Sequence, residues 1–169
     1  MQRPKKSEYD PYFDHYVQLT RGANALQNLN DSGEMLIRFL ENLPEDKRDY
    51  AYEEGKWTVQ QLVQHLIDCD LVFTYRALWM ARGGEPNLAG FDENIWANNA
   101  KKASLNWNET LQQFKTLRNF TVGVFKSLPN ELMDQTATVS GSQTTLRSLP
   151  FIIAGHSFHH LTILKERYL

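Results

Sequence analysis

Three of the five histidines in the chain fall within the segment AGHSFHH, at positions 156, 159 and 160. In a helix, His156 and His160 would lie one turn apart on the same face, with about 6 Å between their Cβ atoms. His159 would lie about 100° around the helix from His160 and would therefore have a different role. Two imidazoles spaced in this way can bind the same metal ion, so this segment is the first candidate for a functional site.

A third imidazole can be expected beside this pair. His65 lies in another helical segment, on the side of Leu62 and Cys69, so its ring faces the interior. Three neutral nitrogens with one open coordination position are typical of catalytic zinc, although imidazole also suits nickel, iron and copper. The alternative is that His156 and His160 are core residues satisfied by side chains or water, with His65 unrelated. The residues alone leave both interpretations open.

Other residues near the third histidine could take part in the site. Cys69 could be a fourth, soft ligand, but a free cysteine on an apolar face more often serves for packing, and we adopt that interpretation. Asp68 could hydrogen-bond to a ligand imidazole, although a solvated helix carboxylate is the simpler interpretation. Arg76 lies on the same inward side, which predicts a structural ion pair with Asp92 or Glu93.

The elements that must position these residues are four long segments with helical periodicity. Thr58 with Gln61, and Asn106 with Glu109, have the spacing of two capping boxes, which predicts where the second and third helices begin. The four predicted helices cover about residues 23–43, 58–82, 106–128 and 146–169.

The connections between these helices are long. Residues 87–104 form a loop with a short helix, and the Thr-rich segment 133–145 is predicted to be an irregular connection, with no convincing strand in the chain. Four amphipathic helices favour an all-α fold, a four-helix bundle, and the long connections leave a crossover topology open.

The composition of the chain excludes several classes of function. Its 169 residues include 18 basic and 20 acidic side chains that are well mixed, which argues against a nucleic-acid-binding surface. No apolar run approaches the roughly 18–20 residues that cross a bilayer, so no membrane partner is expected. The single cysteine rules out an intramolecular disulfide and fits a reducing compartment, and we predict a cytoplasmic protein. No P-loop, G-x-S-x-G or dinucleotide motif is found.

Three segments resemble the DinB/YfiT-like proteins. They are GKWTVQQLVQHLIDCDLVFTYRALWMARG, GFDENIWA and IIAGHSFHHLTILKERYL. The resemblance implies one DinB-like four-helix-bundle domain over residues 1–169. It also implies one divalent ion per chain, zinc or nickel, held by His65, His156 and His160. Members of this family often form homodimers.

The resemblance implies a metal-dependent enzyme that acts on a small molecule, either a small-thiol S-transferase or a hydrolase. A low-molecular-weight thiol would be the cofactor of the transferase. Asp92 is the expected acid–base group, since it lies in the loop from Gly83 to Ala100 that could cover the site. The alternative is a non-catalytic metal-binding stress-response protein, whose ion joins two helices and whose fourth position is closed by Cys69 or another side chain.

Overall fold

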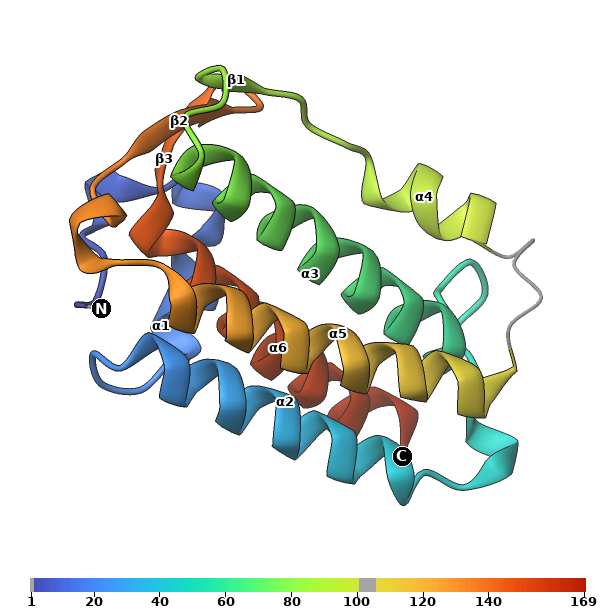
Figure 1. Ribbon diagram of the computed structural model, residues 1–169. Helices are drawn as coiled ribbons and strands as arrows, with labels where there is room; N and C mark the ends of the chain where they lie inside the picture. The colour runs from blue at the N-terminus through green and yellow to red at the C-terminus, as the bar shows by residue number, and fades with distance from the viewer. Residues whose placement is uncertain (1, 101–105) are drawn as a thin grey trace.

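The computed structural model describes residues 2–100 and 106–169, and its long helices confirm the all-α fold class (Figure 1). Four helices of 15 to 23 residues form a bundle: α2 (Ala25–Glu41), α3 (Val59–Ala81), α5 (Trp107–Ser127) and α6 (Leu149–Ile163). α6 continues into a π-helical turn at Leu164–Tyr168. The last residues of the predicted 87–104 loop lie outside the described residues. None of the described helices is long and apolar enough to cross a membrane.

Consecutive helices are not always neighbours in the bundle. α2 and α6 run in one direction, and α3 and α5 run in the opposite direction (Figure 1). α2 packs mainly against α5 and α6, and α3 packs mainly against the same two helices. α2 and α3 therefore lie at opposite corners, and the segment 42–58 crosses one end of the bundle. The sequence analysis left a crossover open at the connections after the second and third long helices, whereas this diagonal connection follows the first.

The two predicted capping boxes fix the starts of α3 and α5. Thr58 Oγ1 accepts a hydrogen bond from the Gln61 N–H at 3.2 Å, and Gln61 Oε1 accepts one from the Thr58 N–H at 2.9 Å. Asn106 and Glu109 form the same reciprocal pair at 3.1 and 3.0 Å. Each cap contributes on the order of 1 kcal/mol to stability. The start of α3 in turn determines which of its side chains face inward.

A small sheet lies at the end of the bundle where α3 ends and α6 begins (Figure 1). β2 (Thr136–Val139) pairs antiparallel with β3 (Ser142–Thr145), and β1 (Asn87–Leu88) pairs parallel with β2. The prediction of an irregular connection without strands is therefore wrong. Ser140 and Gly141 have φ angles of 51° and 87°, so a two-residue turn closes the hairpin. The strands have four residues or fewer, too few to produce a clear alternating pattern.

Two short α-helices of the described residues lie outside the bundle. α4 (Glu93–Ala100) is the short helix predicted in the loop after α3. α1 (Asp14–Leu19), which the sequence analysis did not identify, packs against α6. The contact is close, because a Cβ atom added to Gly155 would lie 2.0 Å from the carbonyl oxygen of Tyr16. A glycine at this position therefore allows the approach of α1.

A polar layer divides the apolar core into two clusters. One cluster includes Phe73 and Phe151, and the other includes Leu66 and Phe114. Between the clusters each long helix contributes a buried polar residue: Ser32, Asp70, Arg118 and Ser157. Buried polar groups are costly unless they are hydrogen-bonded, so this layer specifies how the four helices align.

Candidate metal centre

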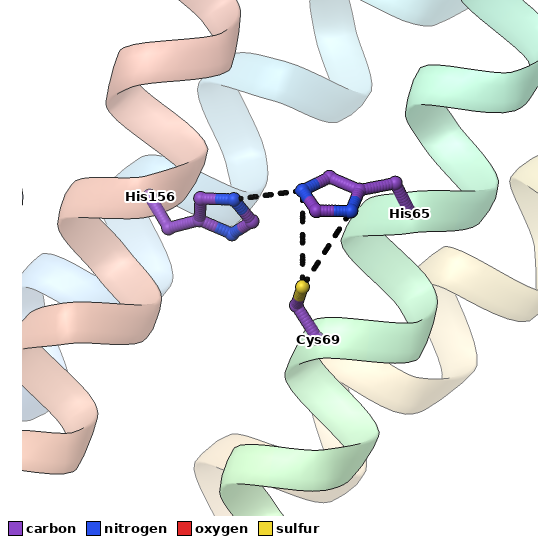
Figure 2. Close-up of side chains that lie close together, drawn as sticks. All are labelled: His65, Cys69 and His156. Carbon is purple, nitrogen blue, oxygen red and sulfur yellow. Dashed lines mark hydrogen bonds between the residues drawn. The ribbon is translucent and has the colours of Figure 1, made fainter. Parts of the chain in front are cut away.

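The three predicted histidines meet between α3 and α6. The Nε2 atom of His156 lies 3.0 Å from Nε2 of His65 and 2.9 Å from Nε2 of His160. Figure 2 shows His65 on α3 facing His156 on α6. All three side chains are buried. His156 and His160 thus have the spacing expected of them on one face of α6. Tertiary packing brings His65 from α3 to this pair.

These nitrogens fit a metal ion better than they fit one another. An imidazole nitrogen carries either one proton or one lone pair, so Nε2 of His156 cannot form two ordinary hydrogen bonds with His65 and His160. Two nitrogens bound about 2.0–2.1 Å from one ion are separated by about 2.9 Å at a right angle and about 3.4 Å at a tetrahedral angle. The observed separations of 3.0 and 2.9 Å lie in this range. The residues present therefore fit a divalent ion.

Burial keeps the three imidazoles neutral. Desolvation lowers the pKa of His65 to about 4. It also lowers the pKa values of His156 and His160 well below the ordinary value, and repulsion from the neighbouring histidines adds to this effect. Metal binding requires unprotonated nitrogen, so at neutral pH no proton has to be displaced from the cluster.

Cys69 lies closer to the cluster than its predicted packing role requires. Its Sγ atom is 3.7 Å from Nδ1 and 3.8 Å from Nε2 of His65 (Figure 2). One ligand atom each from His65, Cys69 and His156 lies within 4.8 Å of the others, so these three residues form a group that could hold an ion. This group includes Cys69 and leaves out His160. Nitrogen and sulfur ligands on one tetrahedral zinc are separated by about 3.6 Å. Burial raises the pKa of the Cys69 thiol, so sulfur ligation would require an ion to displace its proton.

Aromatic packing helps to orient the histidine rings of the cluster. The Nδ1 atoms of His156 and His160 are buried and have no hydrogen-bond partner within the described ranges. The Tyr16 ring lies edge to face with His156 at 5.2 Å between ring centres, and the Trp57 ring lies 4.6 Å from His65. The close approach of α1 to α6 therefore places an aromatic wall directly beside the cluster.

The polar layer holds α6 in register beside the cluster. Arg118 pairs with Asp70 at 2.7 Å, and it donates hydrogen bonds to Ser32 Oγ at 2.9 Å and Ser157 Oγ at 2.7 Å. Because Ser157 directly follows His156, this network fixes the rotation of α6. The sequence analysis did not identify these residues. The available signal is that Asp70 falls on the apolar face of its helix, where a carboxylate needs a buried partner.

The cluster lies at the wall of a cavity of about 490 Å³. Aromatic side chains form much of the lining: Tyr12, Phe13, Tyr16, Trp57, Phe73 and Phe91. Apart from the three histidines, the polar side chains of the lining are Asp10, Arg76, Glu93 and Ser140. A largely apolar cavity of this size with a few polar groups is typical of sites for small molecules.

Glu93, and not the predicted acid–base residue Asp92, lines the cavity. Asp92 is exposed and outside the cavity lining, and its Oδ1 atom accepts hydrogen bonds from the N–H groups of Asn94 and Ile95, each at 2.9 Å. Its carboxylate therefore caps the start of α4. Glu93 is half-buried and lines the cavity. The acid–base role of Asp92 stays a prediction, and Glu93 is better placed for it.

The remaining residues that the sequence analysis considered near the site are Arg76, Asp68 and His159. Arg76 is buried in the cavity wall, but in the described parts of the chain no carboxylate lies within 4 Å of it, so the predicted ion pair with Asp92 or Glu93 is absent. Asp68 accepts a hydrogen bond from Gln64 at 2.9 Å. His159 faces His15 with ring centres 5.5 Å apart, outside the histidine cluster, as its position on the helix predicts.

Comparison with known proteins agrees with this geometry. The sequence profile described as the DinB superfamily matches residues 28–164. A relative from Bacillus mycoides, named as a candidate metal-dependent hydrolase, is 26% identical over 146 residues, which cover 84% of each chain.

Two solved structures have the same fold. YfiT from Bacillus subtilis, named a probable metal-dependent hydrolase with an unusual four-helix bundle topology, has a TM-score of 0.74 and 20% identity. The similarity covers 96% of this chain and 89% of YfiT. A mycothiol-dependent maleylpyruvate isomerase has a TM-score of 0.70 and 12% identity, over 82% of this chain and 58% of the isomerase. At these identities the similarity concerns the fold alone.

Proposed function

The chain belongs to the DinB superfamily, and we propose that it is a metal-dependent enzyme in which His65, His156 and His160 bind one divalent ion, zinc or nickel. The observation that carries this proposal is the meeting of three neutral Nε2 atoms at the wall of a cavity of about 490 Å³. Three such ligands leave at least one coordination position open toward a small-molecule substrate.

A bound divalent ion would supply Lewis acidity and would lower the pKa of a water or thiol at its open position. The chain's own residues would do the rest of the work. The aromatic lining would shelter the substrate from bulk water and hold its apolar part. Glu93, half-buried at the cavity wall, would accept the proton of the attacking group and later return it to the leaving group.

Two reaction classes suit this arrangement: hydrolysis of a small substrate, and transfer of a low-molecular-weight thiol to an electrophile. The name of the Bacillus mycoides relative supports the first class. The fold shared with a mycothiol-dependent isomerase supports the second. In both classes the nucleophile would occupy the open position beside the histidines, and Glu93 would handle its proton.

The position of Cys69 favours one alternative, a non-catalytic metal-binding protein. If its sulfur, 3.7 Å from the His65 ring, joined the histidines, the coordination sphere would be closed and the ion would join α3 to α6. The two functions therefore differ in the number of sulfur ligands and in whether the ion has an exchangeable position.

The experiment begins with metal content. The protein loaded with zinc or nickel should contain about one equivalent by elemental analysis, and His156→Ala should lose most of it. His159→Ala is the matched control, because His159 neighbours the cluster without joining it, and it should keep its metal. Equal metal content in the parent and in the triple alanine variant of the proposed ligands would refute the site.

Activity and coordination are tested next. The metal-loaded protein is screened with cellular thiols against a model electrophile, and separately with ester and amide substrates. Turnover that disappears in His156→Ala, while the circular dichroism spectrum persists, supports the enzyme. X-ray absorption of the zinc form should show nitrogen ligands and an exchangeable light atom. A closed sphere with one sulfur ligand would instead establish the non-catalytic alternative.

Four expectations from the sequence stay predictions: the homodimer, the cytoplasmic location, the absence of a nucleic-acid partner and the single domain over residues 1–169. Sedimentation velocity of the metal-loaded protein checks the first of these. A sedimentation coefficient of a 19.6 kDa monomer at all concentrations would contradict it.

A further inference from the structure

Arg76 is a buried cation whose counter-charge is missing from the described residues. Its side chain is 4% exposed and lines the same cavity as the histidine cluster. Its guanidinium donates one hydrogen bond, from Nη2 to the carbonyl oxygen of Ala89 at 2.9 Å. The guanidinium carbon also lies 5.5 Å from the ring centre of Phe73 and 5.8 Å from that of Phe91. Within the described ranges no carboxylate comes within 4 Å of it.

Arg118, the other buried arginine among the described residues, is satisfied in a different way. Arg118 is 3% exposed, pairs with Asp70 at 2.7 Å and donates hydrogen bonds to two serine hydroxyls. It lies in the polar layer and not in the cavity lining. The same fold thus gives one buried guanidinium a carboxylate and leaves the other facing a cavity. A buried charge is costly when it is unpaired, which implies that the partner of Arg76 comes from outside the chain.

We infer that Arg76 binds the carboxylate of a small-molecule ligand whose other end reaches the histidine cluster. A guanidinium presents a planar fork that matches a carboxylate in a bidentate pair, a geometry that a lysine cannot offer. The rings of Phe73 and Phe91 beside the guanidinium limit its movement and exclude water from the pair. The identity of the reacting end rests on the proposed function, but anion binding at Arg76 does not require the metal.

Helix geometry gives the size of this ligand. Arg76 follows His65 by eleven residues, so their Cα atoms are about 16 Å apart along the axis of α3 and only about 20° apart around it. Long side chains on a helix lean toward its N-terminus, which brings the guanidinium toward the cluster. A ligand that contacts both is therefore on the order of 10 Å long. Its middle would lie against the aromatic lining and would be apolar.

Two carboxylates also line the cavity, and neither replaces the ligand. Asp10 already accepts hydrogen bonds from the Ser142 hydroxyl and from the Tyr12 N–H. Glu93 lies in the lining but not within ion-pair distance of Arg76. With a divalent ion bound, the charges of the ion and Arg76 exceed those of the two carboxylates, which strengthens the preference for a monoanionic ligand. Without the ion, that preference rests on the bidentate pair with Arg76 alone.

The test compares a carboxylate with a neutral molecule of the same shape. The full-length protein, metal-free and zinc-loaded, is titrated by calorimetry with 3-phenylpropanoate and with 3-phenylpropanamide. We expect the wild type to prefer the carboxylate by tenfold or more in both forms. Arg76→Gln should lose this preference while keeping its zinc content and its affinity for the amide. Arg76→Lys, which keeps the charge without the fork, should retain part of it.

Arg48→Gln is the matched control. The guanidinium carbon of Arg48 also lies near an aromatic ring, 5.4 Å from the centre of the Trp107 ring, but outside the cavity lining, and this variant should bind both probes as the wild type does. No preference for the carboxylate in the wild type, including no binding of either probe, would overturn the inference. The inference would also be overturned if both Arg76 variants kept the full preference for the carboxylate. A preference that requires zinc and is lost in His156→Ala would overturn it as well. If the chain fails to bind zinc but prefers the carboxylate through Arg76, the proposed function fails and this inference stands.

Discussion

The substitution of Gly155 by alanine tests whether the approach of α1 to α6 builds the site. An added Cβ would lie 2.0 Å from the Tyr16 carbonyl oxygen, 2.4 Å from its carbonyl carbon and 3.0 Å from its Cα. These are backbone atoms, so no side-chain rotation can relieve the overlap. α1 would have to move by about 1 Å or more for the oxygen contact to reach the shortest distance normal for a Cβ atom. The shift would carry the Tyr16 ring away from His156.

The magnitude follows from two opposing effects. Alanine in place of glycine within a helix stabilises by about 0.5–1 kcal/mol. Overpacking against a rigid backbone destabilises by about 1–3 kcal/mol, and a contact with three backbone atoms belongs at the upper end of that range. We therefore expect a net loss of about 2–2.5 kcal/mol, which lowers the Tm of a chain of this size by roughly 4–10 °C.

Gly123→Ala is the internal control for this prediction. Gly123 also lies inside a long helix, α5, but its added Cβ would meet nothing within 4 Å. Only the helix-propensity effect remains there, so this variant should be more stable by about 0.5–1 kcal/mol. Urea unfolding of both variants, followed by circular dichroism, gives the two signs directly. A Gly155→Ala protein as stable as the wild type would refute the close contact and with it the role of α1 in the site.

Three further predictions follow from the site and its support. Cys69→Ala should lower stability by roughly 1 kcal/mol through lost packing and leave zinc affinity within a few-fold, as isothermal titration would check; a loss of orders of magnitude would mean sulfur ligation. Asp70→Asn leaves the charge of Arg118 buried without its partner and should cost about 3–5 kcal/mol by urea unfolding, whereas a cost under 1 kcal/mol would contradict the ion pair. Zinc at about a hundred times its Kd should stabilise the wild type by about 2.7 kcal/mol, a rise in Tm of roughly 5–10 °C, and His65→Ala should show little or none of this rise in differential scanning calorimetry.

Local information in the sequence determined the helices and the face that carries the histidines. The capping boxes at Thr58 and Asn106 are formed by residues three positions apart, so the sequence alone predicts where α3 and α5 begin. The spacing of His156 and His160 depends only on the pitch of α6, and this pair indeed meets at 2.9 Å. The all-α bundle follows in the same way, because four amphipathic faces must be buried against each other.

Only the tertiary structure decided how these helices combine. Three features join residues that are far apart in sequence. They are the order that places α3 beside α5 and α6, the pairing of Asp70 with Arg118, and the fit of α1 against Gly155. The strands β2 and β3, and the lack of a carboxylate beside Arg76 in the described residues, also depend on what packs against them. Local periodicity specifies which face of a helix is apolar, but not which helix will cover it. The choice between neighbours rests on close packing and on satisfying buried polar groups, and these exist only once the chain has folded.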